Sequence, residues 1–328
     1  MRSTSAPHAG APLETVRAAM DTFIQQILNG LVLGSMYSLI ALGYTMVYGI
    51  LNLINFAHGD VLTVGALTAL TTIVALQAMF PGLPGWVLII AGLLAAIPVC
   101  VVLSLVIERV AYRPLRNAPR LAPLITAIGV SIVIQTVAML VWGRNYLTFP
   151  QLMSNAPIEV AGATVTITKL LVIILSAAVM VGLMLLVNRT RLGRAMRATA
   201  EHPRVAGLMG VNPNFVIAMT FAIGAALAAL AGVMLAATYS VAHFYMGFLP
   251  GLKAFTAAVL GGIGNIPGAM LGGLLLGLIE ALGAGYIGDL TGGVLGSHYQ
   301  DIFAFLILVL VLIFRPSGLL GERVADRA

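Results

Sequence analysis

Residues 189–213, with the sequence RTRLGRAMRATAEHPRVAGLMGVNP, form a strongly basic stretch in a chain that is otherwise poor in charge. The stretch carries five arginines and one carboxylate, Glu201, and a long apolar run lies on either side of it. An apolar run of about 20 residues matches the length that a helix needs to cross the hydrocarbon core of a bilayer. We therefore expect a polar arm in water that joins two membrane-spanning helices.

The composition of the whole chain also indicates a membrane protein. Of its 328 residues, 60% are hydrophobic and 9% are charged, whereas a soluble domain carries about 25% charged residues. The alternating pattern of a transmembrane β-barrel does not occur, and Gly30 and Gly34 have the spacing that lets two helices approach closely in lipid. We predict an all-α polytopic membrane protein with about 8–10 transmembrane helices, some of them short or broken.

The positive charge has a simpler explanation than binding to nucleic acid. The net charge is +6, but the arginines lie in short loops between apolar runs, where the positive-inside rule holds loops in the cytoplasm. We therefore expect membrane lipid around the chain and no nucleic-acid partner. Two apolar runs separate the basic cluster 108–120 from the arm, so both are expected on the cytoplasmic side. Counting only long runs gives about eight crossings, and treating both broken regions alike gives about ten, with both chain ends in the cytoplasm.

One transmembrane domain accounts for most of the chain. Residues 1–20 lack the apolar core of a signal peptide, and their Ser, Pro, Ala and Gly content predicts a disordered extension, with Met20 as an alternative start of translation. Residues 21–321 form the transmembrane domain, in which the arm 189–213 is a cytoplasmic loop, and residues 322–328 form a cytoplasmic tail. The single cysteine, Cys100, lies in an apolar run and can form no internal disulfide.

Two regions interrupt the apolar pattern in a similar way. LINFAHGDVLTVGALTAL at 53–70 and LGGIGNIPGAMLGGLLLGL at 260–278 each place a short polar break between a short helix and a helix rich in Gly and Ala. Unsatisfied backbone cannot face lipid, so we expect each break to be buried in protein or to line a cavity. Matching interrupted helices in two halves of a membrane protein point to an internal repeat and a transport path.

Polar residues in these breaks are the candidates for lining such a path. Asn55 and Asn265 hold matching positions, and either side chain can bond backbone groups that the break frees. His58 and Asp60 are ionisable residues within the membrane, which are costly and commonly functional. In a purely structural alternative, Asp60 caps a helix that starts at Val61. The path candidates are Asn55, His58, Asp60, Gly264 and Asn265.

Motifs of catalysis and cofactor binding do not occur in the sequence. GGIGNIPGAM is rich in glycine but lacks the Lys-Ser/Thr pair of a phosphate-binding loop, and HExxH, paired cysteines and GxSxG do not occur. Glu280 lies near the end of an apolar run and is expected to reach the membrane interface. A proton relay needs a series of ionisable residues across the membrane. We therefore expect no catalytic residue, no metal, no cofactor and no proton relay.

The arm has the sequence of two short helices. Residues 194–201 favour a helix, Pro203 suits the first position of a second helix and Gly210 suits its end, so we predict a short helix over 203–209 on the cytoplasmic face. This helix would present Val205, Ala206, Leu208 and Met209 to a partner protein. The alternative is a solvated loop that only orients the chain, for which about two or three arginines suffice. The residues expected to contact the partner are Arg197, Ala200, Glu201, Pro203, Ala206, Gly210 and Asn212.

Three long segments make the chain resemble a known family. They are LNGLVLGSMYSLIALGYTMVYGILNLINFAHGD (28–60), GRAMRATAEHPRVAGLMGVN (193–212) and KAFTAAVLGGIGNIPGAMLGGLLLGLIEAL (253–282). Together and in this order, they resemble the membrane permease subunits of branched-chain amino acid ABC importers, over residues 20–321.

The resemblance implies an ABC importer permease fold in a bacterial inner membrane. It also implies a second related permease subunit, two cytoplasmic ATPase subunits and an extracytoplasmic binding protein that delivers the amino acid. In the family, the ATPases contact a loop that matches Ala200–Asn212 and resembles in role the EAA loop of other ABC importers. Glu201, Ala206 and Gly210 are the nearest counterparts in this chain, although their spacing departs from the EAA pattern.

Two other functions compete with this one. The INFAHGD and GGIG segments are also similar to those of urea and short-chain amide importers, in which case the substrate would be an amide. A stand-alone channel or ion-coupled carrier would instead work without ATPases and would need an ion site near the middle of the membrane. The low intramembrane charge of the chain argues against this last function.

Overall fold

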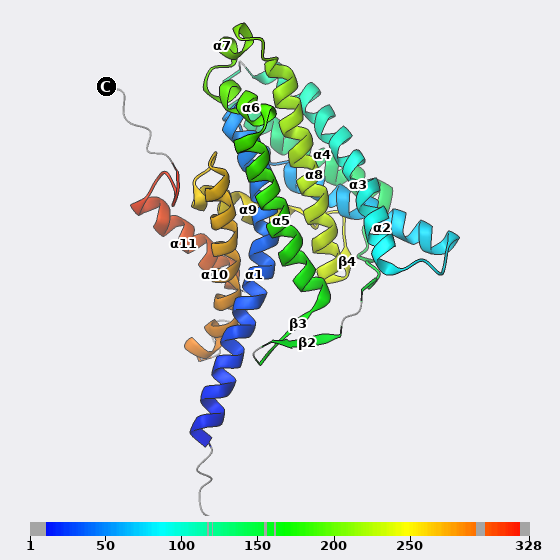
Figure 1. Ribbon diagram of the computed structural model, residues 1–328, viewed down its shortest axis with the longest axis vertical. Helices are drawn as coiled ribbons and strands as arrows, with labels where there is room; N and C mark the ends of the chain where they lie inside the picture. The colour runs from blue at the N-terminus through cyan, green and yellow to red at the C-terminus, as the bar shows by residue number, and fades with distance from the viewer. Residues whose placement is uncertain are drawn as a thin grey trace, which may run out of the picture.

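The computed structural model describes residues 11–116, 118–119, 121–153, 156–160, 162–292 and 299–321. Figure 1 shows long helices packed along one another, with the short helices α6 and α7 at one end of the molecule. The long helices are α1 (Ala11–Leu51), α2 (His58–Met79), α3 (Gly85–Ile107), α4 (Leu121–Trp142), α5 (Ile167–Arg189), α8 (Pro213–Tyr239) and α10 (Ile266–Leu290). The shorter helices are α6 (Arg191–Glu201), α7 (Pro203–Leu208), α9 (Phe248–Gly261) and α11 (Gln300–Phe314).

Seven helices in the described part of the chain are long and apolar enough to cross a membrane, namely α1, α2, α3, α4, α5, α8 and α10. Helix α9 and residues 305–314 of α11 form shorter apolar helices. The all-α polytopic fold predicted from the sequence is confirmed. The two expected counts of crossings differ chiefly in how they treat such short segments.

Helix α1 extends further toward the N-terminus than the sequence pattern indicated. It begins at Ala11, so residues 11–20, which we expected to belong to a disordered extension, are helical. The physical reason is that this segment contains good helix formers, such as Leu13, Glu14 and Arg17, and joins an apolar helix directly. It therefore adds turns to an existing helix without a new nucleation step. Residues 1–10 and 322–328 lie outside the described residues.

The two ends of α1 lie at opposite ends of the bundle (Figure 1). Near its start, the side chain of Gln25 donates a hydrogen bond to the carbonyl of Thr164, just before α5 begins, at 3.1 Å. Near its end, Gly49 and Ile50 line a pocket with Arg197 of α6, which follows α5. Helices α1 and α5 are therefore parallel, and α1 starts on the side opposite the arm. We expected both chain ends on the side of the arm, but the described start of α1 lies on the other side, because α1 is one continuous crossing.

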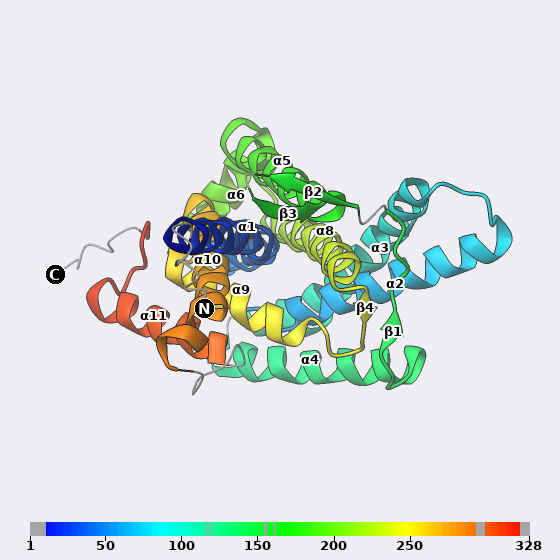
Figure 2. The same ribbon diagram turned by 90° about the horizontal axis from the view of Figure 1, so that it is seen from below.

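Helices α1 and α10 lie side by side with their backbones close together (Figures 1 and 2). A Cβ added at Gly30 would lie 2.8 Å from the Cα of Leu278, and one added at Gly34 would lie 2.8 Å from the Cα of Leu274. Lipid tails are as apolar as the helix surfaces, so close backbone packing is a main source of attraction between membrane helices. The glycine spacing noted in the sequence thus forms a helix–helix contact at the centre of the fold.

Two small antiparallel sheets lie at the end opposite the arm. Strand β2 (Pro157–Val160) pairs with β3 (Ala163–Thr166), and β1 (Leu147–Thr148) pairs with β4 (Val241–Ala242). The second of these sheets joins the loop after α4 to the loop after α8. It fixes the relative positions of the two helices at that end of the bundle.

Replacing Gly34 by alanine should destabilise the subunit. The new Cβ would fall against the backbone of α10, which cannot move away without separating the two helices. We expect Gly34→Ala to lower the stability of the purified subunit by about 1–3 kcal/mol, seen as a lower melting temperature in detergent. The matched control is Gly182→Ala on α5, where an added Cβ meets nothing within 4 Å. An equal melting temperature for both variants would contradict the tight α1–α10 contact.

Candidate functional site

The arm, residues 189–213, folds into the two short helices predicted from the sequence. Thr190 caps α6, because its hydroxyl oxygen accepts a hydrogen bond from the backbone N–H of Gly193 at 3.1 Å. Helix α6 ends at Glu201 and α7 begins at Pro203, whose missing N–H costs nothing in a first turn. The arm is therefore an ordered helical element, as the docking interpretation requires.

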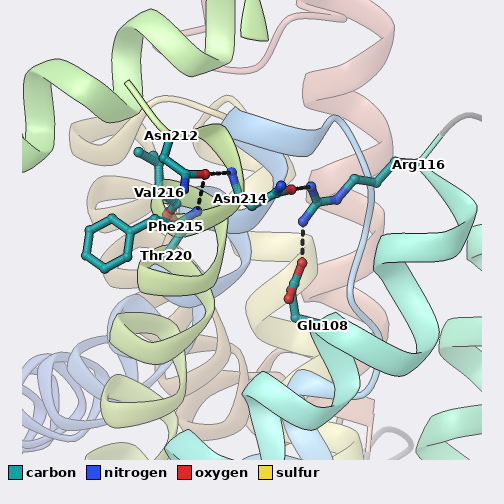
Figure 3. A network of polar contacts seen from close by, with 7 residues as sticks. All are labelled: Glu108, Arg116, Asn212, Asn214, Phe215, Val216 and Thr220. Carbon is teal, nitrogen blue, oxygen red and sulfur yellow. Dashed lines mark hydrogen bonds and ion pairs between the residues drawn. The ribbon is translucent and has the colours of Figure 1, made fainter. Parts of the chain in front are cut away.

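The turn from α7 into α8 is closely defined. Gly210 has a φ of +84°, a conformation that glycine adopts without strain, and the N–H of Val211 donates to the carbonyl of Ala206 at 3.0 Å. Asn212 then caps α8, because its side-chain oxygen accepts hydrogen bonds from the next two free N–H groups, at 3.1 and 3.3 Å (Figure 3). Gly210 and Asn212, which the sequence singled out, therefore set the angle at which the arm joins α8.

One face of α7 and its end is apolar and uncovered. Leu208 is 87% exposed, Met209 is 81% exposed and Val205 is also exposed. Ala206, in contrast, is buried, so the expectation that it faces a partner protein was wrong. The methyl group of Ala206 faces the protein interior, and its carbonyl accepts the hydrogen bond from Val211 that closes the turn after α7. Of the other expected contact residues, Ala200 is half-buried and the exposed ones are Arg197, Glu201, Pro203, Gly210 and Asn212.

The basic cluster 108–120 is hydrogen-bonded to the start of α8, next to the arm. The guanidinium group of Arg116 forms an ion pair with Glu108 and donates a hydrogen bond to the side-chain oxygen of Asn214 at 2.7 Å (Figure 3). Because Asn214 directly follows the arm, the two basic clusters lie on the same side, as predicted. The positive-inside rule assigns that side to the cytoplasm.

A pocket of about 130 Å³ lies beside α6. Arg197 of α6 donates a hydrogen bond to the carbonyl of Val187 near the end of α5, which fixes the orientation of α6. The remaining walls come from the second half of α1 and from the second helix break, and the lining includes Thr45, Met46, Gly49, Met196, Gly264 and Ile266. Helix α6 also packs against α1, and Gly264 of this break packs against Gly49 of α1. A displacement of α6 would therefore act on α1 and, through α1, on this break.

Break 1, residues 52–57, joins α1 to α2 and is bonded to the segment that follows α3. Asn55 is buried, and its side-chain oxygen accepts a hydrogen bond from the hydroxyl of Tyr112 at 3.0 Å. The carbonyl of Ile54 lies 3.4 Å from the same hydroxyl and shares its single hydrogen as a second, weaker acceptor. Tyr112 belongs to a turn of π-helix that follows α3. No local sequence pattern connects it to the break, which is why the sequence did not identify it.

Asp60 lies inside the first turn of α2 and does not cap it. The helix begins at His58 and has no side-chain cap, so the capping explanation was wrong. One oxygen of Asp60 accepts a hydrogen bond from the side-chain amide of Gln135 on α4 at 2.9 Å. The other oxygen has no hydrogen-bond partner among the described residues, although Asp60 is only 1% exposed. A buried carboxylate with a free oxygen is unusual inside a membrane domain and is compatible with a role in the transport path.

The side chain of His58 packs tightly against α1. Its side chain is 3% exposed, and its ring packs edge-on against Tyr44 with the ring centroids 4.9 Å apart. Its Nε2 has no hydrogen-bond partner among the described residues and occupies the place of a side chain at Gly43. Gly43 therefore makes the room that His58 needs, a relation that only the packing of α1 on α2 reveals.

Break 2, residues 262–265, is covered by the C-terminal segment, residues 315–321. The N–H groups of Leu319 and Leu320 donate hydrogen bonds to the last two carbonyls of α9, both at 2.9 Å. These carbonyls end a helix within the membrane domain and would otherwise be unpaired. The segment that follows α11 thus completes the end of α9.

Asn265 bonds freed backbone groups, as the sequence predicted. Its side-chain oxygen accepts a hydrogen bond from the N–H of Gly268 at 3.0 Å, and its side-chain amide donates to the carbonyl of Leu320 at 2.8 Å. Gly264, with a φ of +95°, packs against Gly49 of α1 and lines the pocket beside α6. The path candidates thus fall into two groups. Those of break 2 lie beside the arm, and the others lie in break 1 and in the first turn of α2.

Glu280 does not reach the membrane interface as expected. It is 2% exposed and forms an ion pair with Lys253 on α9 at 2.6 Å. The reason is that its partner approaches from a different helix, which a reading of α10 alone does not show.

Comparison with known proteins identifies the family of the chain. Residues 26–312 match the family model described as "Branched-chain amino acid transport system / permease component". The chain is 48% identical over 305 residues to the high-affinity branched-chain amino acid transport system permease protein BraD of Pseudomonas aeruginosa, which covers 92% of this chain and 96% of the relative. It is 46% identical, with the same coverage, to LivH of Escherichia coli strain K12, another high-affinity branched-chain amino acid transport system permease protein.

A more distant relative is the probable branched-chain amino acid transport permease protein LivH of Methanocaldococcus jannaschii, 28% identical over 301 residues, or 90% of this chain and 92% of the relative. No solved structure matches the chain. The matched residues 26–312 include the arm and both breaks, and the chain belongs to the family of branched-chain amino acid transport system permease components, which are multi-pass inner-membrane transport subunits and not enzymes.

Proposed function

We propose that this permease subunit carries branched-chain amino acids across the inner membrane in complex with a second related permease subunit, two cytoplasmic ATPase subunits and an extracytoplasmic binding protein. The observation that carries the proposal is the arm, an ordered helix pair whose end exposes Leu208 and Met209 on the cytoplasmic side. The chain has no phosphate-binding loop. The energy of ATP must therefore enter from another protein, and the arm is the surface suited to receive it.

Two features explain how a displacement of α7 would be transmitted to the transport path. Helices α6 and α7 are separated only by His202, so they respond together. Helix α6 in turn shares a pocket with the second half of α1 and with Gly264 of break 2. Because α1 leads directly into break 1, movement of the arm is expected to shift both breaks at once.

The chemistry of the substrate suits Asp60, which lies in the first turn of α2, directly after break 1. An amino acid carries an ammonium group, and the free oxygen of Asp60 offers it a hydrogen-bond acceptor with negative charge. Gln135 occupies the other oxygen and would be the contact that keeps Asp60 in place. In this proposal, His58 and Asn55 line the same route, and Gly264 and Asn265 form the part nearest the arm.

The proposal is tested by uptake into proteoliposomes that contain the subunit, its second permease subunit and both ATPases, with the binding protein outside. We expect uptake of leucine that requires ATP and every partner. Gly210→Pro should reduce this uptake at least about tenfold, because proline fixes φ near −65° where the arm needs +84°. ATP hydrolysis without uptake is the expected signature of an arm that no longer transmits force.

Gly207→Ala is the matched control for this variant. Gly207 lies in α7, is exposed and has free space for a Cβ, so alanine should leave uptake unchanged. A second variant, Leu208→Glu, removes an exposed apolar contact without touching the fold and should also reduce uptake. Normal uptake by both Gly210→Pro and Leu208→Glu would contradict docking through the arm. Uptake by the subunit alone, or of urea in place of leucine, would contradict the proposed function.

Asp60→Asn tests the path interpretation. The asparagine oxygen can still accept the hydrogen bond from Gln135, so the fold should be retained while the negative charge is lost. We expect leucine uptake to fall at least about tenfold, which corresponds to the loss of one charge-assisted hydrogen bond of about 1.5–3 kcal/mol. Asp21→Asn, near the start of α1, is the control and should transport normally. If Asp60→Asn transports like the wild type, the carboxylate has no part in the path.

A further inference from the structure

Four side chains from four helices meet inside the membrane domain, outside the arm and both breaks. The ammonium group of Lys253 on α9 lies 2.6 Å from an oxygen of Glu280 on α10 and 2.7 Å from an oxygen of Asp301 on α11. The hydroxyl of Tyr37 on α1 donates a hydrogen bond to the other oxygen of Glu280 at 3.0 Å. We call these four residues the Lys253 cluster.

The two carboxylates of the Lys253 cluster are not equivalent. Both oxygens of Glu280 have partners, and the residue is almost fully buried. The side chain of Asp301 is 38% exposed and meets Lys253 through one oxygen. If Asp301 moves away, Lys253 and Glu280 remain a neutral pair, whereas the loss of Lys253 would leave a buried negative charge without a counter-ion, which is costly. The contact of Asp301 can therefore break at a much lower cost than the Lys253–Glu280 pair.

Helix α9 connects the Lys253 cluster to break 1. Phe255 follows Lys253 by two residues, so the two side chains point to nearly opposite faces of the helix. The ring of Phe255 packs against Phe56 of break 1, with centroids 5.5 Å apart, and against Tyr44, with centroids 6.0 Å apart. Close by, the N–H of Gly247 donates a hydrogen bond to the hydroxyl of Thr63 on α2 at 2.9 Å. One face of α9 thus rests on break 1 while the opposite face is held by ion pairs.

We propose that the Lys253 cluster positions α9 for transport. The Lys253–Glu280 pair holds α9 against break 1, and Asp301 is a releasable contact that joins the start of α11 to this pair. The inference rests on the proposed function, because break 1 and the first turn of α2 carry three of the path candidates. Lys253, Glu280 and Asp301 are positioning residues, which act through α9 and do not touch the amino acid.

The far end of α11 shows why Asp301 is the contact that can open. The C-terminal segment, which follows α11, is bonded to the end of α9 through the N–H groups of Leu319 and Leu320. Release of Asp301 would therefore free the start of α11 while its end stays attached to α9. Such a motion changes the support of α9 without dissociating the helix.

The first experiment measures leucine uptake per ATP hydrolysed in proteoliposomes with all partner subunits. Asp301→Asn retains the neutral Lys253–Glu280 pair, so the subunit should assemble and hydrolyse ATP, but uptake per ATP should fall severalfold. Asp301→Glu restores the charge and should restore most of that ratio, which a loss of assembly would not explain. Glu159→Gln, on exposed strand β2, is the control and should behave as the wild type. An unchanged ratio in Asp301→Asn would overturn the proposal.

The second experiment does not depend on transport. We expect Lys253→Met to lower the melting temperature of the purified subunit by roughly 5 °C or more, because it leaves a buried carboxylate unpaired. The double variant Lys253→Met with Glu280→Gln removes that charge and should recover part of the loss. Strictly additive effects would contradict the buried pair. If the wild type shows no ATP-driven uptake, the proposed function fails, and this series still decides whether the Lys253 cluster holds α9.

Discussion

A helix break inside a membrane must find hydrogen-bond partners within the protein, and the cytoplasmic half of this chain depends on that constraint. Break 1 finds Tyr112, which follows α3, and break 2 finds the C-terminal segment, which follows α11. Both partners are distant from their breaks in sequence. Satisfying the breaks therefore draws the ends of α3 and α11 toward the region where the arm lies, and Arg116 ties that region to the start of α8.

Because these helix ends lie close to the arm, the arm is connected to the helices that carry the two breaks. Helix α6 meets α1 and break 2 around one pocket, and α1 runs from that pocket to break 1. Helix α9 links the two breaks, because it ends at break 2 and packs on break 1 through Phe255. The Lys253 cluster holds α9 from the opposite face. A force applied at α7 would thus act on a short series of helices joined at two non-helical breaks, which is an arrangement suited to switching between two states.

The sequence predicted features that depend on local chemistry. Pro203, Gly210 and the arginine clusters indicated the arm, its two helices and its side of the membrane, because caps, turns and topogenic charges act over a few residues. It did not predict the partners of buried polar groups. The bonds of Asp60 to Gln135 and of Glu280 to Lys253 join different helices, and a single-helix pattern assigned the first to a cap and the second to the interface. The inward orientation of Ala206 was missed for the same reason, since exposure within α7 depends on how the arm rests on the bundle.

In the proposed complex, the arm receives the force of ATP hydrolysis from a partner on the cytoplasmic side. A photo-crosslinking residue at position 208, compared with one at position 146, tests this most directly in membranes that contain all subunits. Leu208 and Tyr146 are both strongly exposed, at 87% and 75%. Leu208 ends α7, and Tyr146 stacks on His243, which follows β4; α7 and β4 lie at opposite ends of the bundle (Figure 1). We expect an adduct between position 208 and the ATPase subunit and no ATPase adduct from position 146. An ATPase adduct from position 146, or the absence of one from position 208, would show that the ATPase does not dock on the arm.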